Sequence, residues 1–181
     1  MPRLFAIALL IALAPAARSQ AIGADSQPDS QRLTPQDIDA LIRLAEGPDA
    51  AQSIAAVARL AVADFIGNNP SIDPALAALY ARSVAVGDRA LARRIDEAHV
   101  FGADSLARAM RTALLSSHTR TEELNLLKAL GEDARLESLP ATNPLNGELI
   151  ALLFSDDARV ADAAAALLKS PPARHCARSP T

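Results

Sequence analysis

Apolar residues recur at helical spacing along most of the chain, between short polar turns. After Thr34 and Pro35 the next segment carries one apolar stripe, and Gly47 ends it; such spacing places the apolar side chains on one face of an α-helix. The same order of start signal, apolar stripe and stop signal continues to Pro171. It predicts eight helices, which begin near residues 34, 49, 73, 88, 104, 119, 143 and 157.

Three of these helix starts combine a capping side chain with a proline, which suits the first helical turn. They are Thr34-Pro35, Asp73-Pro74 and Asn143-Pro144, and their prolines lie 39 and 70 residues apart. Because 70 is two steps of 35, a further start is expected near residue 109, close to the helix that we expect Asp104 to cap. The spacing predicts four antiparallel helical hairpins of about 31–39 residues, a period typical of stacked helical repeats. An irregular helical bundle is the alternative.

The last predicted hairpin has its own pattern in ALLFSDDARVADAAAALLKS, residues 151–170. Leucines end one helix, an acidic turn follows, and a valine leads into an alanine-rich helix; the residues are Asp157, Val160, Ala163, Ala164 and Leu167. Residues 144–169 thereby resemble a HEAT-type helical repeat, and residues 86–98 resemble it more weakly. The family usually has an arginine directly after the valine, where this chain has Ala161. The resemblance implies a short α-solenoid and carries no activity with it.

The alanines of this last helix indicate close packing, because small side chains let helix axes approach to the short end of about 8–10 Å. We expect Ala163, Ala164 and Ala166 to face the preceding helix around residues 149–153. Three phenylalanines lie at the ends of predicted helices, and we expect them to fill the ends of the hairpins: Phe65, Phe101 and Phe154.

The first residues predict export. Arg3 is followed by an apolar run from Leu4 to Ala14 and then by small residues, the pattern of a secretory signal peptide with cleavage after residue 16, 17 or 21. The run is shorter than the about 20 residues of a membrane-spanning helix, although an uncleaved anchor is the alternative. The predicted organisation is a signal peptide at 1–21, a disordered lead-in at 22–33, an all-helical domain at 34–170 and a disordered tail at 171–181.

Composition supports an all-α fold and narrows the functions. The chain has 41 alanines against four Phe, one Tyr and no Trp, and alanine favours helices whereas strands favour β-branched and aromatic residues. Cleavage after Ala21 leaves 16 basic and 21 acidic side chains, a net charge of −5. We therefore expect no nucleic-acid partner, because such proteins usually carry a basic surface. Cys176 is the single cysteine, which excludes an internal disulfide.

No catalytic or cofactor motif stands out. His99 follows Asp96 at a spacing that places both on one helix face, but a metal needs three or four converging ligands. His118 lies in a serine-rich turn, and His175 adjoins Cys176 in the predicted tail. We expect no catalytic residue, no cofactor and no metal.

Six arginines in the two central hairpins form the one candidate interaction patch: Arg82, Arg89, Arg93, Arg94, Arg108 and Arg111. Such a patch suits an acidic partner or an anionic envelope polymer, and a solvated helix face is the alternative. The sequence predicts a non-catalytic exported helical-repeat protein, periplasmic or secreted, that acts as a protein-interaction scaffold for another envelope protein. A small-ligand or metal-binding helical bundle is the alternative, and a hydrolase that uses His99 or His118 comes third.

Overall fold

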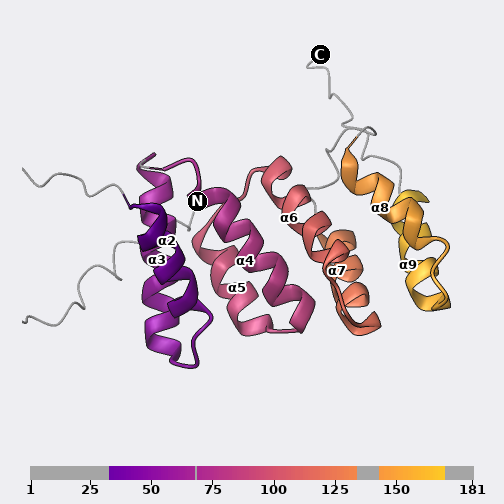
Figure 1. Ribbon diagram of the computed structural model, residues 1–181, viewed down its shortest axis with the longest axis horizontal. Coiled ribbons are helices and arrows are strands. Elements are labelled where there is room, and N and C mark those ends of the chain that lie inside the picture. The colour runs from indigo at the N-terminus through magenta and orange to yellow at the C-terminus, as the bar shows by residue number, and fades with distance from the viewer. Residues whose placement is uncertain (1–32, 68, 134–142, 170–181) are drawn as a thin grey trace, which may run out of the picture. The chain divides into compact units, whose positions relative to one another are not determined.

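The computed structural model describes residues 33–67, 69–133 and 143–169 (Figure 1). The predicted signal peptide and the predicted tail lie outside the described residues, and so does the predicted lead-in apart from its last residue. That residue, Leu33, is buried in the core, directly before the first helix described.

Every regular element in the described part of the chain is an α-helix, which confirms the all-α prediction. The helices, labelled as in Figure 1, are α2 (Pro35–Ala45), α3 (Ala50–Phe65), α4 (Ile72–Val86), α5 (Arg89–Ala98), α6 (Ala103–Leu115), α7 (Arg120–Glu132), α8 (Pro144–Leu152) and α9 (Ala158–Lys169). Their starts agree with the predicted ones to within two residues.

Side-chain caps explain most of these starts. Thr34 and Thr119 each form a capping box, in which the cap oxygen accepts from the backbone three residues later and the side chain there accepts from the cap N–H. Asp49, Asp88 and Asn143 cap α3, α5 and α8 through their side-chain oxygens. Between α4 and α5, Gly87 ends the helix at a φ of 82°, in the left-handed region that only glycine adopts at low cost.

The predictions that Asp73 and Asp104 are N-caps are wrong. Helix α4 begins one residue before Asp73, and its N-cap Ser71 makes no side-chain cap hydrogen bond. Helix α6 begins after Gly102, so Asp104 lies inside the first turn. Acidic residues are favoured anywhere in the first turn by the helix dipole, so their presence there does not define the cap. The carboxylate of Asp73 bonds instead to the end of α5.

Successive helices pair as hairpins, α2 with α3, α4 with α5, α6 with α7, and α8 with α9 (Figure 1). The first helices contact one another in the order α2, α4, α6, α8, and among the second helices α3 contacts α5 and α7 contacts α9. Helix α4 also contacts α3 and α7. The main contacts therefore join helices of the same hairpin or of neighbouring hairpins, a packing that is compatible with a stacked repeat and with an irregular bundle.

Polar contacts between neighbouring hairpins recur at similar sequence separations. Four such hydrogen bonds join residues 36, 36, 37 and 40 positions apart: Arg82 to Glu46, Asn69 to Leu33, Arg111 to Glu148, and Asn125 to Ala85. These separations are close to the 35-residue step between the proline-marked starts. The same step in sequence thus brings one hairpin against the next at several positions.

The alanine-rich helix α9 packs against both α7 and α8. Val160 and Ala164 are completely buried, and Ala163 packs against the core from its edge. The prediction for Ala166 is wrong, because its side chain is exposed. Leu149 in α8 is buried, whereas two other residues expected at this contact are exposed, Ile150 in α8 and its C-cap Leu153. The inward side of α9 is therefore narrower than the run of alanines suggested.

The three phenylalanines that we expect at hairpin ends also differ in burial. Phe101 is buried, with its ring centroid 5.4 Å from that of Tyr80 and 4.8 Å from that of His99. Phe65 and Phe154 are 91% and 83% exposed, so the prediction that they fill hairpin ends is wrong. The exposure of such large apolar side chains needs a physical explanation. Phe65 belongs to the hairpin α2–α3 and Phe154 to the hairpin α8–α9.

Candidate functional site

His99 lies at a junction of four helices. It is the C-cap of α5 and is almost completely buried. Its Nε2 lies 2.8 Å from Oδ1 of Asp73 in α4, and its Nδ1 lies 3.7 Å from Oδ2 of Asp64 near the end of α3. A carboxylate only accepts hydrogen bonds, so Nε2–H donates to Asp73. The sequence paired His99 with Asp96, whereas the two ring nitrogens face Asp64 and Asp73.

Asp73 extends this junction to α6. The backbone N–H of Gly102, the N-cap of α6, donates to Asp73 Oδ1 at 3.4 Å. Burial raises the pKa of Asp73, but hydrogen bonds from Ser105, from His99 and from the Gly102 backbone together outweigh burial and hold the pKa below its usual range. The Asp73 carboxylate therefore stays ionised and ties the start of α4 to the end of α5 and the start of α6.

This junction does not have the geometry of a catalytic relay. In a catalytic triad, the histidine is hydrogen-bonded to the serine nucleophile through one ring nitrogen and to the carboxylate through the other. Here the carboxylate of Asp73 stands between His99 and Ser105, and the second ring nitrogen faces Asp64. The two aspartates also approach opposite nitrogens of one ring, so they do not converge on a common point where a metal could sit. The arrangement fits a structural role.

The predicted arginine patch is distributed over two groups of helices. Arg82 on α4 and Arg108 on α6 line one groove, of about 350 Å³, between these two helices. The other lining residues are small or carry hydroxyl groups: Pro74, Ala78, Ser105, Ala109, Thr112, Ala113 and Ser116. Because Ser105 also bonds Asp73, one end of the groove adjoins the histidine junction.

The other four arginines lie outside this groove. Arg111 on α6 binds Glu148 on α8, with Nη2 at 2.8 Å from Oε1, and so joins the third hairpin to the fourth. Arg89, Arg93 and Arg94 are on α5; Arg94 donates to the buried hydroxyl of Ser53 on α3 at 2.9 Å. The other two α5 arginines are exposed. Arg82 also has a partner, Glu46, at 2.8 Å, but both side chains are about half exposed.

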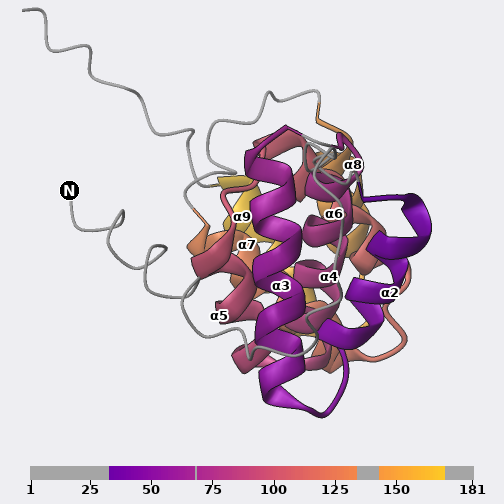
Figure 2. The same ribbon diagram turned by 90° about the vertical axis from the view of Figure 1, so that its left-hand side faces the viewer.

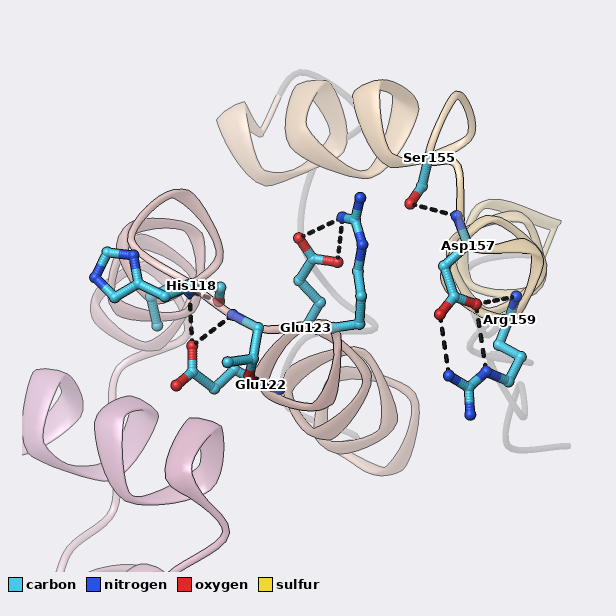
Figure 3. Close-up of polar contacts among 10 residues, drawn as sticks. His118, Glu122, Glu123, Ser155, Asp157 and Arg159 are labelled. Atoms are coloured by element: carbon cyan, nitrogen blue, oxygen red, sulfur yellow. Dashed lines mark hydrogen bonds and ion pairs between the residues drawn. The ribbon is translucent and has the colours of Figure 1, made fainter.

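His118 and the acidic turn of the last hairpin show local capping only (Figure 3). His118 donates through its backbone N–H to Glu122 Oε2 at 2.7 Å, and Figure 3 draws no contact from its ring. Asp157 accepts from the backbone and guanidinium of Arg159, two residues later, and these bonds lower the pKa of Asp157. This aspartate, which the HEAT-type pattern singled out, is thus bonded to an arginine of its own turn.

Sequence reasoning missed the partners of His99. Asp73 was interpreted as a cap because it precedes a proline, and Asp64 carried no signal, since it lies near the end of a mostly apolar helix. Their meeting depends on how hairpins stack, which no local pattern reports. The lining of one groove by both Arg82 and Arg108 depends on the same stacking.

No family model, curated protein or solved structure matches the chain. Within the described ranges, no helix is long and apolar enough to cross a membrane. Among the residues that the structure describes, no group of three or more histidine, cysteine or acidic side chains could hold a metal ion.

Proposed function

We propose that the chain is a non-catalytic exported scaffold protein that binds another protein of the cell envelope through the groove between α4 and α6. The observation that supports this proposal is that Arg82 and Arg108, from two different hairpins, line one groove. A binding surface that spans hairpins is how stacked helical repeats commonly engage partners. The export part of the proposal rests on the N-terminal apolar run and the small residues after it.

The chemistry of the groove favours an acidic, extended segment of the partner. A guanidinium binds a carboxylate through two parallel hydrogen bonds, and two arginines on adjacent helices offer two such positions. Alanines at positions 78, 109 and 113 also line the groove, and their small side chains leave space for a partner backbone. Hydroxyls of Thr112 and Ser116 donate to carbonyls of α6 at 2.9 and 2.8 Å, which leaves their oxygens as acceptors.

The existing pair between Arg82 and Glu46 does not oppose this role. Both side chains are about half exposed, and exposed ion pairs contribute about 0–1 kcal/mol. A partner carboxylate can therefore replace Glu46 at small cost. Arg82 would then act as a switchable contact between its own hairpin and the partner.

The test is capture of a single envelope protein by the full chain, expressed with its own N-terminal segment. The double variant Arg82→Glu, Arg108→Glu reverses the charge of the groove, and Arg89→Glu, Arg93→Glu makes the same charge change on α5. We expect the groove variant to lose capture by about tenfold or more and the α5 variant to retain it. Capture by the wild type should also weaken with salt, as exposed ionic contacts do. Equal loss in the two variants, or loss in neither, would contradict the groove as the binding site.

A further inference from the structure

Helix α3 is apolar on its exposed side as well as on its core side. Ile54, Val62, Phe65 and the adjoining Ile66 are between 42% and 91% exposed. Together with nearby alanines these residues form what we call the α3 face: Ala51, Ile54, Ala55, Ala58, Val62, Phe65 and Ile66. Its neighbours on the exposed side are Gln52 and Arg59. A helix that is apolar all round is normally buried on every side.

This face belongs to the first hairpin, α2–α3, which lies nearest the viewer in Figure 2. Terminal units of a stacked array usually carry polar outer faces, because no further unit covers them. Contiguous apolar patches beyond a few hundred Å² mark interaction sites, and the α3 face offers on the order of 500 Å² from one phenylalanine, three branched side chains and the alanines. The face therefore calls for a partner that is itself apolar.

We propose that a second copy of this chain covers the α3 face, with the two α3 helices antiparallel and crossing at Ala58. In that register, residues equally far from Ala58 on opposite sides face each other across the two-fold axis. Ile54 and Val62 are each four residues away, about 6 Å along the helix, and Ala51 and Phe65 are each seven away, about 10 Å. Ile54 then meets Val62 of the other copy, and the large Phe65 meets the small Ala51.

Four further points favour a second copy as the occupant. Symmetric dimers are the commonest protein oligomers, and they require one patch that complements itself. The α3 face meets this requirement, because the large Phe65 lies opposite the small Ala51 of the other copy. Two such faces would bury about 1,000 Å² in total, the size at which specific interfaces begin. The chain's own lead-in is a poor alternative cover, because between the predicted cleavage site and Arg32 it holds one large apolar residue, Ile22. Alanine at the crossing point allows close approach of the helix axes.

A cross-linking experiment tests this register directly. In the Cys176→Ser background, Ala58→Cys places one thiol per copy next to the two-fold axis, within the short Cβ–Cβ distance of about 3.5–4.5 Å that a disulfide needs. We expect mild oxidation of the full chain to give a covalent dimer in high yield. The matched control is Ala151→Cys, an exposed alanine on α8, which should stay monomeric on a non-reducing gel.

Sedimentation of the full chain from about 1 to about 200 µM gives the second measurement. Val62→Arg should raise the dimer dissociation constant about tenfold or more, whereas Val86→Arg, at another exposed valine, should leave it unchanged. If Val62→Arg does not fold, the cross-link alone decides. A wild-type chain that is monomeric throughout, a mixed disulfide between the Ala58→Cys and Ala151→Cys variants, or binding of the α3 face to lipid vesicles without self-association would each overturn the proposal. The groove variants are expected to dimerise normally, so the two proposals can fail separately.

Discussion

Replacing Ala164 by leucine should destabilise the last hairpin. Ala164 is completely buried in α9, four residues after the equally buried Val160. On the same helix, a Cβ added at Gly131 in α7 would lie 3.3 Å from Leu167 Cδ2, so α7 and α9 are in close contact at that point. Because Ala164 has no exposed surface, three extra heavy atoms must displace its neighbours, and overpacking of this kind costs about 1–3 kcal/mol. For a domain of this size the loss corresponds to a melting temperature lower by about 3–10 °C.

The matched control is Ala166→Leu in the same helix. Ala166 is exposed, so its replacement adds no buried volume, and the small difference in helix propensity between alanine and leucine is the same at both positions. We expect a change in the free energy of unfolding within about 0.5 kcal/mol. This pair of variants also tests the corrected face of α9, because the alanine run in the sequence pointed to both residues as inward.

Urea denaturation and amide hydrogen exchange provide the readouts. Ala164→Leu should lower the denaturation midpoint with little change in slope, and protection should fall in α7, α8 and α9 while α2 and α3 keep theirs, because contacts in a stacked array are between neighbours. Equal costs at Ala164 and Ala166 would refute the assignment of the buried face. A stabilising Ala164→Leu would show that the contact has unfilled space. Protection lost evenly as far as α2 would instead favour a cooperative bundle.

Two further predictions concern single residues. Gly87→Ala should lower stability by about 1–2 kcal/mol, because Gly87 has a φ of 82°. Gly147→Ala, in a helix with open space around it, should raise stability by about 0.5–1 kcal/mol. If both substitutions shift the melting temperature in the same direction, the explanation from backbone conformation is refuted. Burial raises the pKa of Asp73, but hydrogen bonds from Ser105 and His99 outweigh it and hold the pKa below its ordinary value, so the ionised form stabilises the fold above about pH 4 and that contribution is lost as the pH falls further. The difference in melting temperature between wild type and Asp73→Asn should therefore be larger at pH 6 than at pH 3, and a constant difference would contradict this assignment.

The local features of the fold were predictable because their causes are local. Caps such as Thr34 and Asn143, and stops such as Gly87, act on neighbouring backbone groups within a few residues. In α2 and α6 the apolar stripe agrees with the buried face, whereas in α3 Ile54 and Val62 are exposed. Sequence reasoning failed where one signal had two physical explanations: Asp73 before a proline suits a cap, but its carboxylate also suits a buried histidine.

Features that depend on contacts between hairpins could not be read from local patterns. The spacing of start signals gave the approximate number of residues from one hairpin to the next, but not which side chains meet between hairpins. Examples are the approach of Asp64 to His99 and the lining of one groove by Arg82 and Arg108. Phe65 is expected to fill a hairpin end because it is apolar and lies at the end of a predicted helix, but it is exposed. Hydrophobicity predicts that a side chain becomes buried, but it does not say whether the same chain or another one buries it.

The contacts between hairpins differ in kind along the array. His99 joins Asp64 of the first hairpin to Asp73 of the second, and Asp73 also accepts from the Gly102 N–H at the start of the third. The fourth hairpin is joined to the third by the partly exposed pair of Arg111 with Glu148 and by buried apolar side chains such as Leu149 and Val160. Exposed ion pairs contribute little, so apolar burial is the main attachment of the fourth hairpin. The groove between α4 and α6 adjoins the Asp73 junction through Ser105, and this junction holds the two helices that form its walls together.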